Sequence, residues 1–251
     1  MKRRFRVHRG FDSTPDAKIH GTMSQSASTA PLSVSTGDYI KAIWRIAGES
    51  TASTKDISVC LSVAPASVTN MLGRLQEMGF VSYERYHGAS LTERGKGEAL
   101  RLVRRHRLIE TFLLEHLGYT WQEVHDEADR LEHAVSDEFT ERLAEFLGHP
   151  DHDPHGDPIP TSEGVLEPDD SMQLAEVGEG ESVRIFKVSD NSNRVLDYLG
   201  ERGLVPGRLL TVEERREIDG MVVVRDEDGV THHLGGPLVR SVFIRSPRSE
   251  G

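Results

Sequence analysis

Apolar residues recur at helical spacing over most of residues 36–147, and the pattern changes to that of strands after residue 172. In the first of these segments Tyr39, Ile40, Ile43 and Trp44 fall on one face, which predicts an amphipathic helix with Thr36 as its N-cap. A chain with helices first and strands last is predicted to be an α+β protein.

Two short helices are predicted after the first one. One covers residues 54–61 and the other covers residues 66–78, with Pro65 in the first turn and Gly79 as the C-cap. The three-residue joint between these helices is typical of a helix-turn-helix motif. An unspecialised helical bundle is the alternative that this pattern leaves open.

The second short helix has small polar residues on its outer face near its start, where a recognition helix reaches base edges. Strands predicted over residues 80–84 and 89–91 add a wing to the motif. Cys60 is predicted to be a buried core residue. The predicted DNA contacts are Thr54, Lys55, Ser67, Thr69, Asn70 and Arg74.

A long helix over residues 92–117 and a second helix over residues 121–147 are predicted to follow. Packed antiparallel, they would bring His106 and Glu110 beside His125. The second helix has an apolar stripe wider than one helical hairpin covers, so a homodimer is predicted. This stripe comprises Val124, Ala128, Leu131, Val135, Phe139, Leu143 and Phe146.

Residues 148–170 are rich in His, Pro, Asp and Gly and are predicted to form a linker. We interpret their His149, His152 and His155 as part of an irregular surface segment, with weak metal binding as the alternative. The strand-like runs after residue 172, with a short helix over 194–202 between them, predict a five-stranded barrel of SH3 type.

Four segments result from this pattern. The basic and then Ser/Thr-rich start of the chain is predicted to be a disordered extension, either a solvated tail or a stretch before a true start at Met23. Contact of its basic residues with DNA phosphates is the alternative. The predicted segments are the extension at 1–34, a winged helix-turn-helix domain at 35–105, a helical metal-binding and dimerisation domain with its linker at 106–170, and an SH3-like domain at 171–246.

Charge separates these segments. Residues 36–107 have 11 Lys/Arg against 7 Asp/Glu, a net of +4, whereas residues 108–170 have 2 Arg against 18 acids, a net of -16. The first segment suits DNA and the second attracts cations. A single cysteine and no apolar run of membrane-spanning length indicate a cytoplasmic protein without a membrane partner.

The acidic segment contains a cluster with metal-ligand chemistry. His125, Asp129, Glu132 and His133 lie at steps of four, three and one, so on one continuous helix all four share a face. A divalent cation would offset the repulsion between the two carboxylates. Nitrogen and hard oxygen donors without a thiolate suit manganese or ferrous iron. A solvated acidic face is the alternative.

The winged helix, this cluster and two further motifs together resemble the diphtheria toxin repressor family of metal-dependent repressors over residues 36–246. The motifs are His-Arg-Leu-Ile-Glu at 106–110 and Gly-Asp-Pro-Ile-Pro at 156–160. The C-terminal barrel is similar to the FeoA-like domains of longer members of that family.

This resemblance implies two metal sites in each subunit. The primary site would use Asp38, Asp129, Glu132 and His133. The ancillary site would use His106, Glu110 and His125, with the loop at 189–193 as a candidate source of further oxygen ligands.

The resemblance also bears on the metal. The iron-sensing branch places a methionine and a cysteine where this chain has Asp38 and Asp129, whereas the manganese-sensing branch places carboxylates there. Lys41, however, stands where the manganese branch has a further carboxylate, and the short manganese members lack the barrel. The chain thus combines a long architecture with a manganese-like primary site.

The function predicted from all of this is a homodimeric repressor that binds double-stranded operator DNA when loaded with Mn(II) and controls metal-ion homeostasis genes. Fe(II) as the activating ion is the alternative within the family. A metal-handling module without DNA binding is disfavoured by the basic winged helix. An enzyme is disfavoured because no general base accompanies the predicted ligands.

Overall fold

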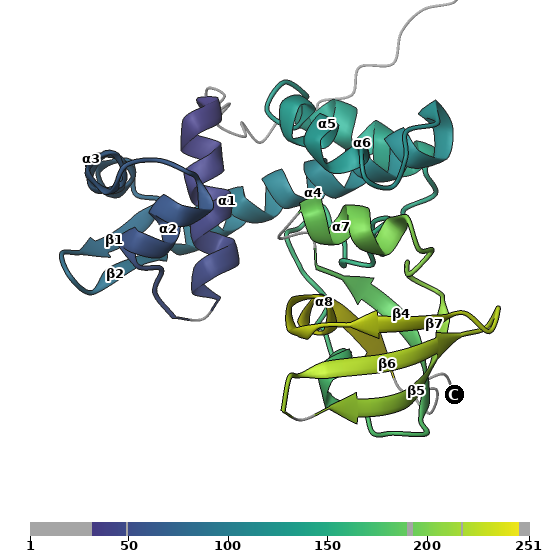
Figure 1. Cartoon of the computed structure of the whole chain (residues 1–251). Coiled ribbons are helices and arrows are strands. Elements are labelled where there is room, and N and C mark those ends of the chain that lie inside the picture. The colour runs from purple at the N-terminus through teal and green to yellow at the C-terminus, as the bar shows by residue number, and fades with distance from the viewer. Residues whose placement is uncertain (1–31, 49, 190–192, 217, 246–251) are drawn as a thin grey trace, which may run out of the picture. The chain divides into compact units, whose positions relative to one another are not determined.

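The computed structural model describes residues 32–48, 50–189, 193–216 and 218–245 (Figure 1). The basic cluster, Met23 and nearly all of the predicted extension lie outside these residues, as do residues 190–192 of the loop considered for ancillary ligands. The described elements confirm the predicted α+β fold with a winged helix-turn-helix, a helical domain and a β-rich domain.

The first domain is the predicted winged helix. Its helices are α1 (Val34–Ala47), α2 (Thr54–Cys60) and α3 (Pro65–Glu77), and its wing strands are β1 (Val81–Glu84) and β2 (Gly88–Leu91), which pair antiparallel. Ile40, Ile43, Ile57, Leu72 and Leu75 form the centre of its core, and each is fully buried. Helix α3 ends before Gly79, whose φ of +77° lets Phe80 N donate to the Leu75 carbonyl at 2.9 Å.

Two expectations for this domain are wrong, those for the cap of α1 and for Cys60. Ser33, not Thr36, caps α1, because the Ser33 hydroxyl accepts from Thr36 N at 3.3 Å while Thr36 itself is buried. Cys60 is half-buried at the surface and accepts a hydrogen bond from Arg45 Nη2 at 2.9 Å.

The helical domain is formed by α4 (Glu93–Leu117), α5 (Val124–Leu131) and α6 (Asp137–Phe146). Helix α4 continues from the winged helix into this domain (Figure 1). The single helix predicted over 121–147 is therefore wrong: the chain turns after Leu131 and α6 begins anew. Ser136 starts α6, because its hydroxyl accepts from Phe139 N at 3.2 Å and two acids follow in the first turn.

The break in this helix also divides the predicted apolar stripe. Val124, Ala128 and Leu143 are buried in the core of the helical domain. Leu131, Phe139 and Phe146, by contrast, are exposed, Phe146 by 61%. The stripe therefore supplies both a core and a separate exposed apolar surface.

The segment predicted as a surface linker is partly buried. Asp153, His155 and Ile159 are within the fold, and His155 is only 1% exposed. Arg107 donates to the Pro158 carbonyl, and Val188 N donates to the His155 carbonyl at 2.8 Å. A side chain at Gly156 would meet the Phe186 carbonyl oxygen at 2.2 Å, so this close approach requires glycine. These contacts fix residues 153–160 between α4 and the following sheet.

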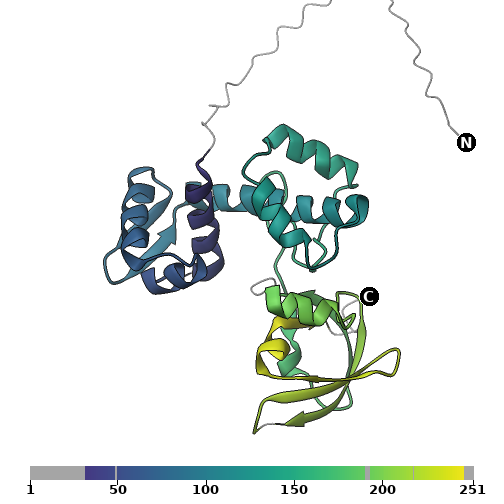
Figure 2. The same ribbon diagram turned by 45° about the horizontal axis from the view of Figure 1, so that its top comes forward.

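The C-terminal domain is an antiparallel sheet with the strand order β3-β8-β4-β5-β6-β7. Six strands are thus described, whereas five were predicted. In Figures 1 and 2 the sheet is strongly curved, and α7 lies at one of its ends. The elements are β3 (Met172–Gln173), the 3₁₀ turn η1 (Leu174–Glu176), β4 (Ser182–Val188), α7 (Asn193–Gly200), β5 (Leu209–Arg216), β6 (Met221–Asp226), β7 (Thr231–Leu234), α8 (Gly236–Ser241) and β8 (Val242–Arg245).

Apolar residues from strands and helices share the core of this domain. Leu196 and Leu199 of α7 pack with Ile185, Leu210 and Val224 of the strands, and all five are buried. Within the described residues, no helix is long and apolar enough to cross a membrane.

Candidate metal centre and DNA-binding face

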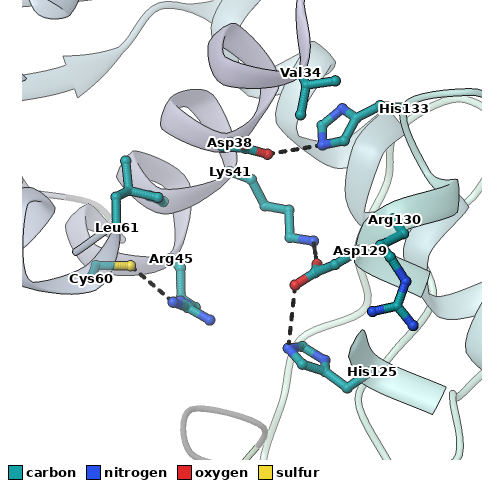
Figure 3. Close-up of a pocket in the computed structure, with 11 residues that line it drawn as sticks. Val34, Asp38, Lys41, Arg45, Cys60, Leu61, His125, Asp129, Arg130 and His133 are labelled. Carbon is teal, nitrogen blue, oxygen red and sulfur yellow. Dashed lines mark hydrogen bonds and ion pairs between the residues drawn. The ribbon is translucent and has the colours of Figure 1, made fainter. Parts of the chain in front are cut away.

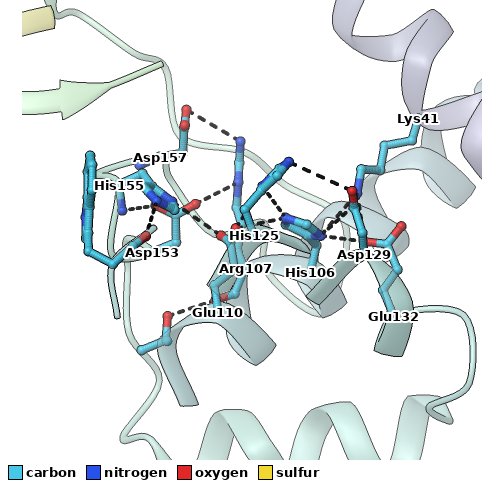
Figure 4. A network of polar contacts seen from close by, with 12 residues as sticks. Lys41, His106, Arg107, Glu110, His125, Asp129, Glu132, Asp153, His155 and Asp157 are labelled. Atoms are coloured by element: carbon cyan, nitrogen blue, oxygen red, sulfur yellow. Dashed lines mark hydrogen bonds and ion pairs between the residues drawn. The ribbon is translucent and has the colours of Figure 1, made fainter. Parts of the chain in front are cut away.

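The seven residues predicted as metal ligands come from three helices and one turn. For clarity, the primary cluster is Asp38, Asp129, Glu132 and His133, and the ancillary cluster is His106, Glu110 and His125. Asp38 lies on α1, His106 and Glu110 on α4, and His125 and Asp129 on α5, while Glu132 and His133 follow α5 (Figures 3 and 4).

The structure brings the three ancillary residues into direct contact. His106 Nε2 lies 3.0 Å from Glu110 Oε1 and 3.2 Å from His125 Nδ1. Glu110 Oε1 and His125 Nδ1 are 3.0 Å apart. Adjacent ligand atoms of an octahedral ion with bonds of about 2.1 Å are separated by about 3 Å. His106 and Glu110 are buried, Glu110 to 1% exposure, and His125 is half-buried. This donor set fits a single divalent ion.

The primary cluster is only partly assembled. Asp38 Oδ1 is 2.9 Å from His133 Nε2, which is 3.3 Å from Glu132 Oε1. Asp129 turns instead toward the ancillary cluster, with Oδ1 3.3 Å from His106 Nδ1 and Oδ2 3.9 Å from His125 Nε2. The structure thus groups Asp38, Glu132 and His133 apart from Asp129.

The expectation that His125, Asp129, Glu132 and His133 share one continuous helix is wrong. Helix α5 ends at Leu131, with Glu132 as its C-cap and His133 in the turn beyond it. The turn allows His133 to contact Asp38 on α1, while Glu132 is buried beside His106. The end of the helix, rather than a shared face, therefore links the winged helix to the helical domain.

Lys41 lies within this centre. Its ammonium Nζ is 2.7 Å from Glu132 Oε2, 3.0 Å from Asp129 Oδ1 and 3.1 Å from His106 Nδ1 (Figure 4). The sequence placed Lys41 at a ligand position of related proteins but gave no sign that its ammonium reaches both clusters. The positive charge of Lys41 thus offsets the negative charges of Asp129 and Glu132.

These short contacts alter the protonation equilibria. Burial would lower the pKa of His106, but the charge of Glu110 and the hydrogen bonds to Glu110 and Glu132 together raise this pKa to about 10. Burial would likewise raise the pKa of Glu110, but His106 holds it well below its usual range. Burial opposes the positive charge of Lys41, whereas Glu132 and Asp129 raise its pKa. The centre thus favours charged carboxylates that attract cations.

A groove of about 510 Å³ leads to this centre. Asp38, Lys41, Asp129 and His133 line it, together with Cys60 (Figure 3). The groove gives solvent and small ions access to the carboxylates of both α1 and α5.

Sequence reasoning missed a further group behind the ancillary cluster. His155 Nδ1 lies 3.7 Å from Glu110 Oε2, and Asp153 Oδ1 accepts from the backbone N of His155 at 2.8 Å. Arg107 Nε pairs with Asp153 Oδ2 at 3.3 Å. Burial, together with the nearby Glu110 and Asp157 carboxylates, raises the pKa of Asp153 to about 8. The signal was the compact Asp-Pro-His-Gly-Asp-Pro run, whose glycine requires a close approach to the sheet.

The residues predicted to contact DNA are on the outside of the helix-turn-helix. Ser67, Thr69, Asn70 and Arg74 of α3 are exposed, and Val68 on the opposite face is fully buried. On α2, Lys55 is exposed and Thr54 is half-buried. The face has the arrangement of a recognition helix, and the contacts themselves stay predictions.

Comparisons with known protein families match three consecutive parts of the chain. Residues 31–89 match the family described as "Iron dependent repressor, N-terminal DNA binding domain". Residues 92–161 match "Iron dependent repressor, metal binding and dimerisation domain". Residues 172–246 match the FeoA domain.

Individual relatives agree with these matches. A solved manganese-dependent transcriptional repressor in complex with manganese is 38% identical, with a TM-score of 0.78 over 84% of this chain and 99% of that one. The diphtheria toxin repressor of Corynebacterium efficiens is 30% identical over 61% of this chain and 69% of its own length. The iron-dependent repressor IdeR of Mycobacterium leprae is 28% identical over 77% of this chain and 90% of its own length.

Fold and site together define a transcriptional regulator that couples a metal-binding helical domain to a winged helix. The chain belongs to the diphtheria toxin repressor family of metal-dependent repressors, in its long form with a C-terminal FeoA domain. This membership confirms the family resemblance and the prediction that the chain is not an enzyme.

Proposed function

We propose that this repressor is activated by Mn(II) and binds operator DNA as a homodimer in the cytoplasm to control metal-ion homeostasis genes. The observation that carries the proposal is the contact of Asp38 on α1 with His133 after α5, at 2.9 Å. An ion held by both residues would tie the DNA-binding domain to the helical domain. The ligand residues contribute carboxylates and imidazoles, which suit manganese.

Two metal sites in each subunit are part of this proposal. The ancillary cluster would hold one ion between His106, Glu110 and His125, whose donor atoms are already within 3.2 Å of one another. The primary cluster would hold the other ion once Asp129 joins Asp38, Glu132 and His133. The bound ions would supply charge neutralisation and a rigid link between helices.

The thermodynamic requirement is a difference in metal affinity between two arrangements of the protein. If the arrangement that fits DNA binds the ion 100-fold more tightly, each site contributes about 2.7 kcal/mol toward that arrangement. In the DNA-competent dimer, the two α3 helices would lie one helical turn of DNA apart, or a multiple of it.

The dimer is proposed from apolar surface on the helical domain. Phe139 and Phe146 of α6 are 47% and 61% exposed, and Leu117 at the end of α4 is 56% exposed. The family match over this region is to a dimerisation domain. A second copy of the chain would bury these side chains against their equivalents.

Fe(II) is the second candidate ion. In its favour, the matched family is described as iron dependent, and IdeR shares 28% identity with this chain. In favour of manganese, the ligand residues contain no sulfur donor and the matched 38% identical structure is a manganese-dependent repressor. Donor chemistry therefore favours manganese.

The test is operator binding measured by fluorescence anisotropy under anaerobic conditions. The DNA fragment is first selected from random sequences with the manganese-loaded protein, and a second selection uses the iron-loaded protein. We expect Mn(II) to produce half-maximal binding at a lower free concentration than Fe(II) does. A lower concentration for Fe(II) would identify an iron-dependent repressor, and metal binding without any DNA selection would identify a metal-handling module.

A further inference from the structure

The feature that the family assignment leaves unexplained is the Lys41 ammonium in the metal centre. Lys41 is one helical turn after Asp38 on α1, so the two side chains enter the centre together (Figure 3). Its Nζ contacts Glu132 Oε2 and Asp129 Oδ1, at 2.7 and 3.0 Å. Two of the four primary ligands therefore already hold a cation, and this cation belongs to the protein.

The Lys41 ammonium does not lie among the facing donor atoms of the ancillary cluster. There His106 Nε2, Glu110 Oε1 and His125 Nδ1 contact one another directly. Lys41 reaches His106 only on the other ring nitrogen, Nδ1, at 3.1 Å. An ion can therefore join the ancillary donors without taking the place of the ammonium.

At the primary cluster an ion and the ammonium compete for the same oxygen atoms. A divalent ion bonds carboxylate oxygens at about 2.0–2.2 Å, whereas the ammonium lies 2.7–3.0 Å from Glu132 and Asp129. An ion bonded to both oxygens would lie within the space of Nζ. It would also repel the positive charge of Lys41.

We infer that Lys41 is a tethered cation that makes the two metal sites fill in order, the ancillary cluster first and the primary cluster only after Lys41 has withdrawn. This inference rests on the proposed two-site function. Its consequence is regulatory: the bridge from α1 to the helical domain is a lysine at low metal concentration and a divalent ion at high metal concentration. Lys41 would set the concentration at which the primary site fills.

Manganese binding to the full chain, measured by titration calorimetry, tests the inference. We expect two unequal steps for the native protein. Lys41→Gln should strengthen the weaker step at least tenfold and leave the stronger step within threefold. Lys41→Arg, which keeps the positive charge, should retain a weak second step. Lys41→Met is measured in parallel, because it keeps the apolar stem if Lys41→Gln impairs folding.

Two further backgrounds assign the steps to the clusters. In His125→Ala, which lacks an ancillary ligand, the remaining step should still strengthen when Lys41→Gln is added. In Asp38→Ala, which lacks a primary ligand, the remaining step should not respond to Lys41→Gln. Lys96→Gln is the matched control, because Lys96 is on α4 and pairs with Glu93, outside the centre.

A weaker step that is unchanged or weakened by Lys41→Gln would overturn the inference. So would a native protein that binds two ions with equal affinity. Failure of the proposed function gives a different result. Manganese would then bind, in equal or unequal steps, without increasing the affinity of the protein for the selected DNA.

Discussion

At the residue scale, the ancillary cluster has a neighbour, His155, that is not among its predicted ligands. Glu110 uses Oε1 for His106 and His125, while its Oε2 faces His155. The backbone N of His155 donates to the Asp153 carboxylate, and Arg107 forms an ion pair with the same carboxylate. Outer groups of this kind orient metal ligands and restrict their motion. The buried 153–160 segment thus stabilises the position of Glu110 from behind.

The exposed face of α3 leads to a prediction about two kinds of DNA contact. Asn70→Ala should cost about 1–3 kcal/mol at one position of the selected operator, because an asparagine side chain reads a base edge. Arg74→Ala should weaken all DNA sequences alike and reduce the salt dependence, because an arginine on this face neutralises a phosphate. Anisotropy on operator and random DNA at several salt concentrations measures both effects.

Glu77→Ala, on the same helix, is the control for general damage to α3. The assignment of Asn70 would fail if its substitution lowered the affinity for operator and random DNA equally. The assignment of Arg74 would fail if its loss affected one operator position alone.

At the element scale, periodicity predicted most elements, and local start and stop signals explain where it failed. The apolar spacing of α1, α3 and α4 was sufficient to place those helices. The break after Leu131 was missed because apolar residues continue at similar spacing on both sides of it. Ser136, followed by two acids, was a helix-start signal within that run.

The residues of the candidate metal centre were predictable from the sequence to an extent similar to that of the helices and strands. The identities of the clustered residues followed from spacing and resemblance, because ligand types recur at steps of three and four. The Lys41 contacts were not predictable, since Lys41 lies 65 or more residues from its partners in the chain. The glycine-containing run at 153–158 was a local sign that this segment is packed, but the approach of His155 to Glu110, 45 residues away, had no sign of its own. Such long-range packing leaves no periodic signal in one sequence.

Helix α6 carries the prediction about assembly. Phe146→Glu should weaken the dimer about 10- to 100-fold, because it places a charge in an apolar interface where aromatic residues contribute about 1.4–2.7 kcal/mol. Sedimentation equilibrium at micromolar concentrations measures the change. Val230→Glu alters another exposed apolar residue, in the C-terminal domain, and should leave the dimer intact. Unchanged dimerisation of Phe146→Glu would place the interface elsewhere.

At the scale of the whole molecule, three parts are coupled through α4 and the segment that follows α6. Helix α4 is shared by the winged helix and the helical domain, and Arg107 on it contacts residues 153–158 next to the C-terminal sheet. The metal centre lies where α1, α4 and α5 meet. Asp38 is the predicted ligand on α1, so an ion bound there would join that helix of the DNA-binding domain to the helical domain.

The most direct test of the account is the ratio of operator affinities with and without saturating manganese. For the native protein we predict a ratio of about 100 or more, equivalent to about 2.7 kcal/mol. For Asp38→Ala we predict a ratio below ten with the metal-free affinity unchanged, because the ion then has no ligand on α1. Glu138→Ala, which removes an exposed acid from α6, should keep the native ratio. A native ratio in Asp38→Ala would contradict the claim that metal acts by joining α1 to the turn after α5.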